Sequence, residues 1–187
     1  VGTHTGDDGA GGVLEDLRAM TVGPDGHIYV VNENGSDASV MRFDGQSGAF
    51  IDAFIPKGTT SLDNSFQLLF RPGGHLYIAA DGHMKRFDGT TGAYLGVFDP
   101  NGMNANFSVA LDATDTFAYV RATVGGVYGI HRIRVEDGSY LGVYQARNDG
   151  LFTGSGSIKA LVMAPDDSLY VATDNSGIRH LASATYG

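Results

Sequence analysis

Four polar residues recur at one position relative to four tyrosines. Thirteen residues before Tyr29, Tyr77, Tyr119 and Tyr170 stand Asp16, Asn64, Asn106 and Ser157. Carboxylate, amide and hydroxyl oxygens are the ligands that hard cations such as Ca²⁺ prefer, so this set is a candidate metal site. Asn and Asp also satisfy backbone groups at turns. A Ca²⁺ site with only one carboxylate would be weak, and no second acid stands nearby as a general base. We therefore favour the interpretation that these residues satisfy backbone groups at turns.

Two positions further along the chain, the same four segments carry a second recurring set. Its members are Arg18, Phe66, Ser108 and Lys159. Two cations without a base indicate a channel lining that tolerates anions, or long side chains that fill space. Neither interpretation supplies a hydrolytic set.

The six histidines do not form a recognisable metal pattern. His27 and His75 share a position, but the other repeats have Phe117 and Ser168 there. A zinc site needs three or four converging ligands, and none is evident. Nor does the sequence contain GxSxG, a P-loop or HExxH, so these common catalytic signatures are absent. We therefore expect no catalytic residue and no required cofactor, with Ca²⁺ as the one candidate ion.

The elements that must position these residues are four copies of one repeat. The tyrosines are 48, 42 and 51 residues apart, a period that suits a four-stranded blade. Each copy contains short runs rich in Val, Ile, Tyr and Phe, separated by Gly, Asn and Asp, which predict strands. We expect almost no helix beyond one turn around Leu14–Leu17.

The predicted strands are as follows. The first runs are Ala19–Val22, Gln67–Phe70, Val109–Leu111 and Ala160–Met163; the second are Ile28–Val31, Leu76–Ala79, Ala118–Arg121 and Leu169–Ala172. The third are Val40–Phe43, Met84–Phe87, Ile130–Ile133 and Ile178–Leu181; the fourth are Phe50–Phe54, Tyr94–Phe98 and Tyr140–Tyr144.

Composition limits the classes of partner. With 187 residues, 42% hydrophobic, the chain can bury one good core. We expect a single domain over 1–187, with repeats at about 10–58, 59–102, 103–150, and 151–187 plus 1–9. A net charge of −9 with 12 scattered basic residues argues against nucleic acid as a partner. The sequence has no apolar stretch near the length of a membrane span.

Specific residues carry a resemblance to a known family. They are Pro24, Asp25, Gly26, Tyr29 and Val30 in the first repeat, and Arg86, Phe87, Asp88, Gly89, Thr91, Gly92, Tyr94, Gly96 and Phe98 in the second. This pattern resembles the NHL-type β-propeller repeats of secreted bacterial proteins. The resemblance implies an all-β propeller and a secreted, extracellular location. The four-residue polar set is also similar, by residue type, to the central metal site of gluconolactonase- and paraoxonase-like propellers.

The fourth repeat lacks its last strand, and the first residues of the chain fit the missing column. We expect Val1, Gly2, Thr3, His4 and Thr5 to pair with Ile178, Arg179, His180 and Leu181. The donor strand could come from the same chain and complete a four-bladed ring, or from a neighbour, because an unpaired edge accepts another strand. Exchange between chains would propagate head to tail as a filament, or close as an eight-bladed pair.

The sequence therefore predicts an all-β propeller with four blades of four antiparallel strands, the last blade completed by an N-terminal strand. Its expected function is that of a non-catalytic scaffold or recognition module, with itself or an extracellular protein or glycan as the partner. The alternative is a metal-dependent, lactonase-like hydrolase that uses Asp16, Asn64 and Asn106.

Overall fold

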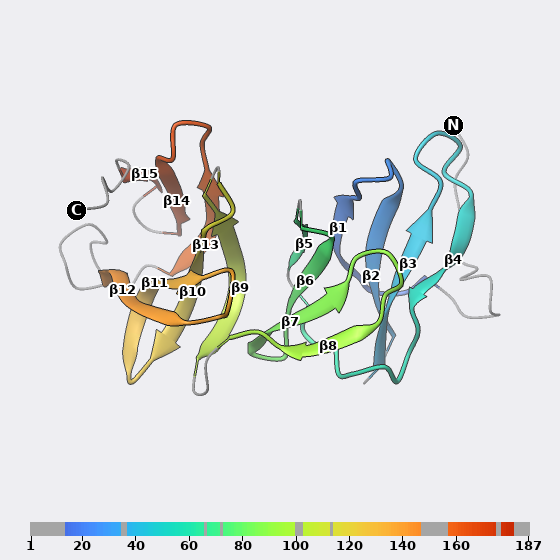
Figure 1. Cartoon of the computed structure of the whole chain (residues 1–187), viewed down its shortest axis with the longest axis horizontal. Helices are drawn as coiled ribbons and strands as arrows, with labels where there is room; N and C mark the ends of the chain where they lie inside the picture. Colours follow the sequence, from blue (N-terminus) through green and yellow to red (C-terminus); the bar gives the residue numbers. More distant parts are fainter. Residues whose placement is uncertain are drawn as a thin grey trace. The chain divides into compact units, whose positions relative to one another are not determined.

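The computed structural model describes residues 14–34, 37–65, 67–71, 73–99, 103–112, 114–146, 157–174 and 177–181. These residues form strands, turns and connecting segments, and none of them lies in a helix. No helix in this part of the chain is therefore long and apolar enough to cross a membrane. The chain divides into two compact units, Val1–Val97 and Phe98–Gly187, and each contains two antiparallel sheets (Figure 1).

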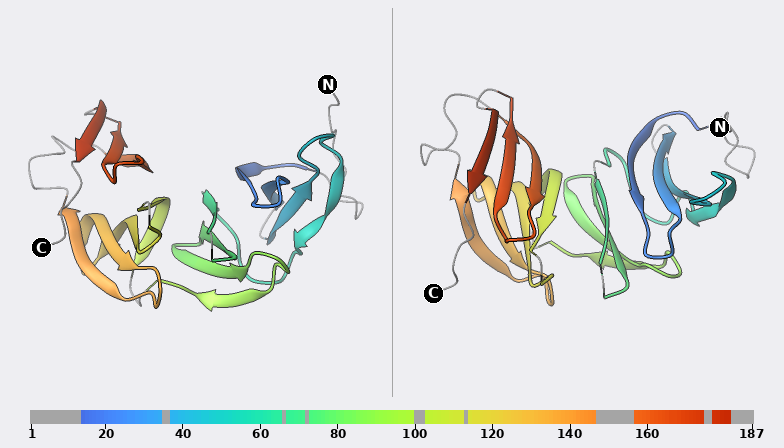
Figure 2. Two further views of the ribbon diagram at one scale, coloured as in Figure 1. Left: turned by 45° about the horizontal axis from the view of Figure 1, so that its top comes forward. Right: turned by 90° about the horizontal axis from the view of Figure 1, so that it is seen from above.

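The first unit holds two four-stranded sheets, which we call the first and second blades. The first blade consists of β1 (Leu17–Val22), β2 (Ile28–Asn34), β3 (Asp37–Phe43) and β4 (Phe50–Ile55). The second consists of β5 (Gln67–Phe70), β6 (His75–Ala80), β7 (His83–Asp88) and β8 (Tyr94–Val97). Strands that are consecutive in the chain are neighbours in each sheet, so both blades are antiparallel meanders (Figure 2).

The second unit has the same organisation. The third blade consists of β9 (Asn104–Leu111), β10 (Phe117–Val124), β11 (Val127–Arg134) and β12 (Tyr140–Ala146). The fourth blade has three described strands, β13 (Ile158–Met163), β14 (Leu169–Thr173) and β15 (Gly177–Leu181). Both sheets again follow chain order.

Each of the fifteen predicted runs falls on one of these strands, so the predicted all-β class is confirmed. The predicted helical turn at Leu14–Leu17 is wrong: residues 14–16 are irregular and Leu17 begins β1. The backbone N–H of Glu15 donates to Asn32 Oδ1 at 3.1 Å, and Asp16 O accepts from the N–H of Glu33 at 2.9 Å. The backbone groups of Glu15 and Asp16 thus hydrogen-bond to β2 and not within a helical turn. A single helical turn is weakly stable by itself, so the contacts with β2 prevail.

The aspartates of the RFDG pattern hold the turn between the third and fourth strands. Asp88 Oδ1 accepts from the N–H of Thr90 at 3.0 Å, and from the N–H and hydroxyl of Thr91 at 2.7 and 2.8 Å. Asp44 makes the corresponding bonds to Gln46 and Ser47. Backbone and hydroxyl donors lower the pKa of both carboxyl groups, so the turns favour the ionised side chains.

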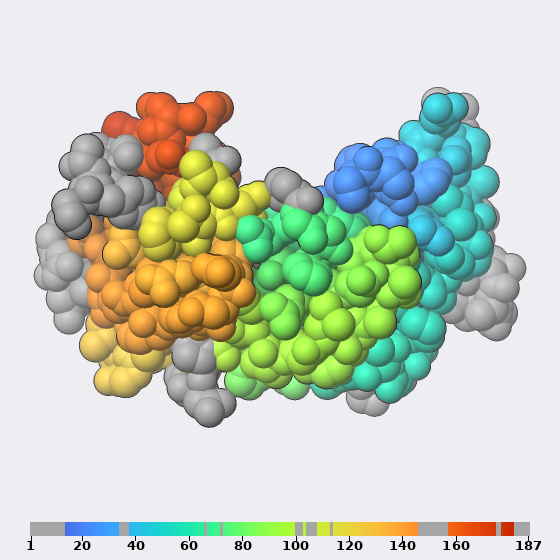
Figure 3. Space-filling model, in the orientation of Figure 1, coloured from blue at the N-terminus to red at the C-terminus, as the bar shows by residue number. Residues whose placement is uncertain are grey.

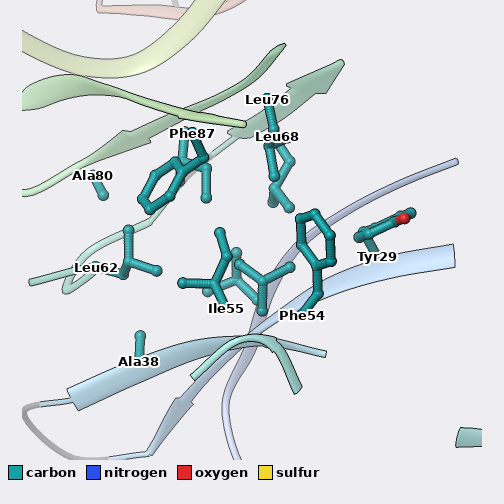
Figure 4. Close-up of a cluster of buried hydrophobic side chains, with 12 residues drawn as sticks. Tyr29, Ala38, Phe54, Ile55, Leu62, Leu68, Leu76, Ala80 and Phe87 are labelled. Atoms are coloured by element: carbon teal, nitrogen blue, oxygen red, sulfur yellow. The ribbon is translucent and has the colours of Figure 1, made fainter. Parts of the chain in front are cut away.

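The tyrosine that marks each repeat defines one face of its blade. We call this the tyrosine face and the other the reverse face, because alternate residues of a strand point to opposite sides. In the first unit, Tyr29, Val31 and Phe54 of the first blade form one buried cluster with Leu68, Leu76, Ile78 and Phe87 of the second (Figure 4). The tyrosine face of the first blade therefore packs on the reverse face of the second.

The second unit repeats this packing. Ala110, Tyr119 and Ile130 of the third blade share a buried cluster with Leu161, Leu169, Val171 and Leu181 of the fourth. Burial of each large apolar side chain contributes about 1.5–3 kcal/mol, so the interface between blades is a main source of stability in each unit.

The predicted closing strand falls partly outside the described residues. Ile178, Arg179, His180 and Leu181 lie in β15, which pairs with β14 along one edge. Among the described residues, no strand pairs with the other edge of β15. Val1, Gly2, Thr3, His4 and Thr5 lie outside the residues that the structure describes.

Candidate functional site

Asp16 and Arg18 lie where β1 begins and form an ion pair. Arg18 Nη2 is 2.8 Å from Asp16 Oδ2, and Arg18 Nε is 3.0 Å from Glu33 Oε2. Glu33, on β2, is buried and the other two side chains are exposed to solvent. The guanidinium thus lies between two carboxylates, where it supplies the positive charge that a bound cation would bring.

Asn64 lies in the turn before β5 and contributes its backbone to the same cluster. Its φ of 52° is in the left-handed region, which Asn adopts more readily than most residues. The backbone N–H of Asn64 donates to Glu33 Oε1 at 3.2 Å. Asp16, Asn64 and Arg18 are therefore all connected to Glu33, and the bond from Asn64 links the second blade to the first.

Ser157 and Lys159 meet a carboxylate in the fourth blade. The backbone N–H of Ser157 donates to Asp174 Oδ1 at 2.6 Å, and Lys159 Nζ is 3.4 Å from Asp174 Oδ2. Partial burial opposes ionisation of Asp174, but these two donors hold its pKa below the ordinary value. Lys159 is consequently paired with an anion, as Arg18 is in the first blade.

The other members of the two predicted sets have different surroundings. Ser108, on β9, is buried, and its hydroxyl oxygen accepts from the backbone N–H of Leu161 in the next blade at 2.8 Å. Asn106 lies on the same strand. Phe66 is outside the described residues. Ser108 thus serves as a link between blades.

Sequence reasoning missed the acidic partners, Glu33 and Asp174. Both stand four residues after a repeat tyrosine, and Asp81 occupies the same position in the second repeat. The backbone N–H groups of Glu33, Asp81 and Asp174 each donate to a carbonyl of the segment before the first strand of their blade. The signal was an acid at three of the four equivalent positions, where the third repeat has Thr123.

The most buried histidine is His131 on β11, which has no exposed surface. Its Nε2 lies 3.1 Å from the carbonyl oxygen of Val127, which can only accept, so Nε2 carries the proton. Nδ1, 2.9 Å from the hydroxyl of Tyr140, then accepts from that hydroxyl. Burial lowers the pKa of His131, which favours this neutral form.

Within the described residues, no group of three or more His, Asp or Glu side chains is placed to hold a metal ion. The polar residues that the structure does place together form ion pairs and hydrogen bonds that connect neighbouring strands and blades. The hydrogen bonds of Asn64 with Glu33 and of Leu161 with Ser108 hold adjacent blades of each unit together near their first strands.

Comparison with known proteins supports the fold. No family model and no curated protein matches the chain. Among solved structures, the extracellular domain of BT4673 from B. thetaiotaomicron is 15% identical over 94% of this chain and 22% of its own, with a TM-score of 0.59. The β-propeller domain of Cps50 (Swd1) from Myceliophteria thermophila is 14% identical over 90% of this chain and 54% of its own, with a TM-score of 0.59.

The WD40 domain of Neurospora crassa Pan2 is also similar, at 13% identity over 91% of this chain and 48% of its own, with a TM-score of 0.60. The chain spans between a fifth and about half of the length of these structures. The matches include a β-propeller domain and a WD40 domain, so they support a propeller without singling out the NHL type. Four antiparallel sheets that match solved propellers give this chain the β-propeller fold, in four blades.

Proposed function

We propose that this chain is a non-catalytic propeller module that acts outside the cell, as a scaffold or recognition unit. The observation that carries the proposal is the position of Arg18 between Asp16 and Glu33. In this group of Asp16, Arg18 and Glu33, the guanidinium pairs with both carboxylates and offsets one of their two negative charges. They hold strands and blades together, which is a structural role.

The similarity to an extracellular domain supports the proposed location. Propellers with little sequence similarity serve many functions, so the shared fold does not identify the partner. We take the partner to be an extracellular protein or glycan, or a second copy of this chain. The NHL-type repeat pattern of the first two repeats fits a secreted module of this kind.

Calcium binding separates this proposal from the lactonase-like alternative. A ligand present at a concentration of 100 times its dissociation constant stabilises the folded state by about 2.7 kcal/mol. For a module without a central cation, the melting temperature in 1 mM CaCl₂ should equal that in EDTA. A clear rise in melting temperature that Asp16→Asn abolishes would contradict the proposal and favour the metal-dependent hydrolase.

Self-assembly is the part of the proposal that can be measured on the purified protein. The edge of β15 that no described strand covers is a template for another strand, and Val1–Thr5 of a neighbouring chain is the proposed donor. Molar mass measured by light scattering should rise with concentration, and deletion of residues 1–5 should reduce this rise. A molar mass that stays at the protomer value of 19.6 kDa up to the highest concentration would refute self-assembly.

A further inference from the structure

We propose that the tyrosine face of the fourth blade docks on the reverse face of the first blade of a second copy. The resulting contact would be the same blade-to-blade interface that each unit already contains. This inference rests on the proposed self-assembly and names the surfaces that carry it. Three positions of the repeat support it.

The first position is the repeat tyrosine. Tyr29, Tyr77 and Tyr119 are between 1% and 4% exposed, whereas Tyr170 is 41% exposed. Val162, which pairs with Tyr170 across the sheet, and Ile178 are also exposed. Ala110, the counterpart of Val162 in the third blade, is buried. Val162, Tyr170 and Ile178 thus give the described part of this face an exposed, largely apolar surface.

The second position lies on the reverse face, in the first strand of each blade. Leu68, Val109 and Leu161 are 4–5% exposed, whereas Met20 of β1 is 67% exposed. The residues of β1, blue in Figure 3, reach the surface of the first unit. Beside Met20 is a pocket of about 210 Å³ lined by Leu17, Arg18, Ala19, Met20 and Val30. The reverse face of the first blade thus offers an apolar recess.

The third position is the glycine of the turn before each fourth strand. A Cβ added to Gly92 would lie 2.1 Å from the carbonyl oxygen of Phe54, on the fourth strand of the preceding blade. At Gly138 the Cβ would lie 2.5 Å from the corresponding oxygen of Phe98. At Gly48 it would meet nothing within 4 Å. The left-handed φ of Gly48 by itself favours glycine, so this position shows only that the space filled by a carbonyl at Gly92 and Gly138 is open in the first blade.

The existing interface shows how the two open faces would fit. Tyr29 contacts Phe70 of the second blade edge to face, with ring centroids 4.7 Å apart. Val22 occupies the position of Phe70 in the first blade and is exposed. By the same register, Tyr170 of one copy would lie against Val22 of the next. A contact between two different faces is heterologous, so it leaves one free face at each end and can propagate.

Two single substitutions test the pairing, because each places a charge on one face only. Met20→Glu blocks the reverse face of the first blade, and Tyr170→Glu blocks the tyrosine face of the fourth. Both sites are exposed, so the fold should survive, and circular dichroism and thermal melting check this. Ile51→Glu and Val143→Glu are matched controls, since they change equally apolar, exposed residues on β4 and β12.

We expect the wild type and both controls to gain mass with concentration in light scattering. Each blocked variant alone should associate at least about tenfold more weakly, because the contact would have to remove a charged side chain from water. An equimolar mixture of the two variants should form a pair of twice the protomer mass and grow no further. In that pair, the intact face of one variant meets the intact face of the other.

The other outcomes overturn the inference in distinguishable ways. Assembly of both blocked variants at the level of the wild type would place self-association on another surface and leave the proposed self-assembly standing. Loss of assembly in one variant only would indicate a symmetric contact. A wild type that stays at protomer mass would overturn both this inference and the self-assembly on which it rests.

Discussion

Tyr29 of the first blade and Phe70 of the second meet edge to face, with their ring centroids 4.7 Å apart. Tyr29 also meets Phe54 of its own blade at 5.0 Å, and its hydroxyl donates to Asp25 Oδ2 at 2.8 Å. The repeat tyrosine therefore joins three strands of two blades through one side chain. This explains why the residue marks the repeat in the sequence.

Truncation of Phe70 should weaken the first unit. We expect Phe70→Ala to lower the free energy of unfolding by about 2 kcal/mol, because it removes a partly buried ring that packs on Tyr29. Val22→Ala at the equivalent, exposed position should change it by less than about 0.5 kcal/mol. Urea unfolding of both variants below the concentration at which chains associate would measure the difference. Equal losses would contradict the assignment of the interface.

The turn glycines offer a second matched pair. Gly48 and Gly92 share a φ of 73°, so an alanine at either costs about 1–2 kcal/mol of backbone strain. At Gly92 the added Cβ also collides with the carbonyl oxygen of Phe54. This overlap should lower the free energy of unfolding by a further amount of about 1–3 kcal/mol. Thermal unfolding of dilute protein should thus find Gly92→Ala clearly less stable than Gly48→Ala. Similar melting temperatures of the two variants would contradict the close approach of Gly92 to the carbonyl of Phe54.

The strands could be predicted from the sequence because they depend on local patterns. Runs such as Ile28–Val31 alternate across a sheet and end at Gly, Asp and Asn, which supply the turns. The observed strands extend most of these runs by one to several residues, as β9 does when it starts at Asn104. The prediction relied on runs of apolar residues, so it did not include the polar residues at the ends of the strands.

The contacts of the candidate site could not be predicted in the same way. The pairing of Arg18 with Glu33 depends on the register of β1 on β2, which shifts at an irregularity between Leu17 and Met20. A sequence column aligns residues of different blades but does not say which strand of the same blade lies beside them. The set around Asp16 was chosen by its polar residue types, and its acidic partner on β2 was not anticipated.

Acid should destabilise the second unit through His131. Burial holds the pKa of His131 below its ordinary value of 6.5, so the folded state binds this proton less tightly than the unfolded chain does. Its contribution to stability is complete above pH 6.5 and is lost as the pH falls below 6.5 through the lower folded pKa.

Chemical unfolding of the wild type between pH 7.5 and 5 should therefore give a falling free energy of unfolding. In His131→Gln this fall should be smaller, since the amide can still donate to the carbonyl of Val127 but does not titrate. The exposed His180 provides a control for the substitution itself, and His180→Gln should change the free energy of unfolding at pH 7.5 by less than about 0.5 kcal/mol. The same slope in His131→Gln and the wild type would show that another group governs the acid sensitivity.

Removal of the guanidinium should test the role of the first-strand ion pairs. Arg18→Gln leaves Glu33, which is 9% exposed, without its cationic partner, so we expect a loss of about 1–3 kcal/mol in the free energy of unfolding. Lys159 and Asp174 are more exposed and 3.4 Å apart, so Lys159→Gln should cost less than about 1 kcal/mol. In Arg18→Gln, a second change of Glu33→Gln should restore part of the loss, because it removes the unpaired buried charge. If Arg18→Gln is as stable as the wild type, Arg18 does not hold the blade together, and its charge is free to serve another purpose such as the binding of an anion.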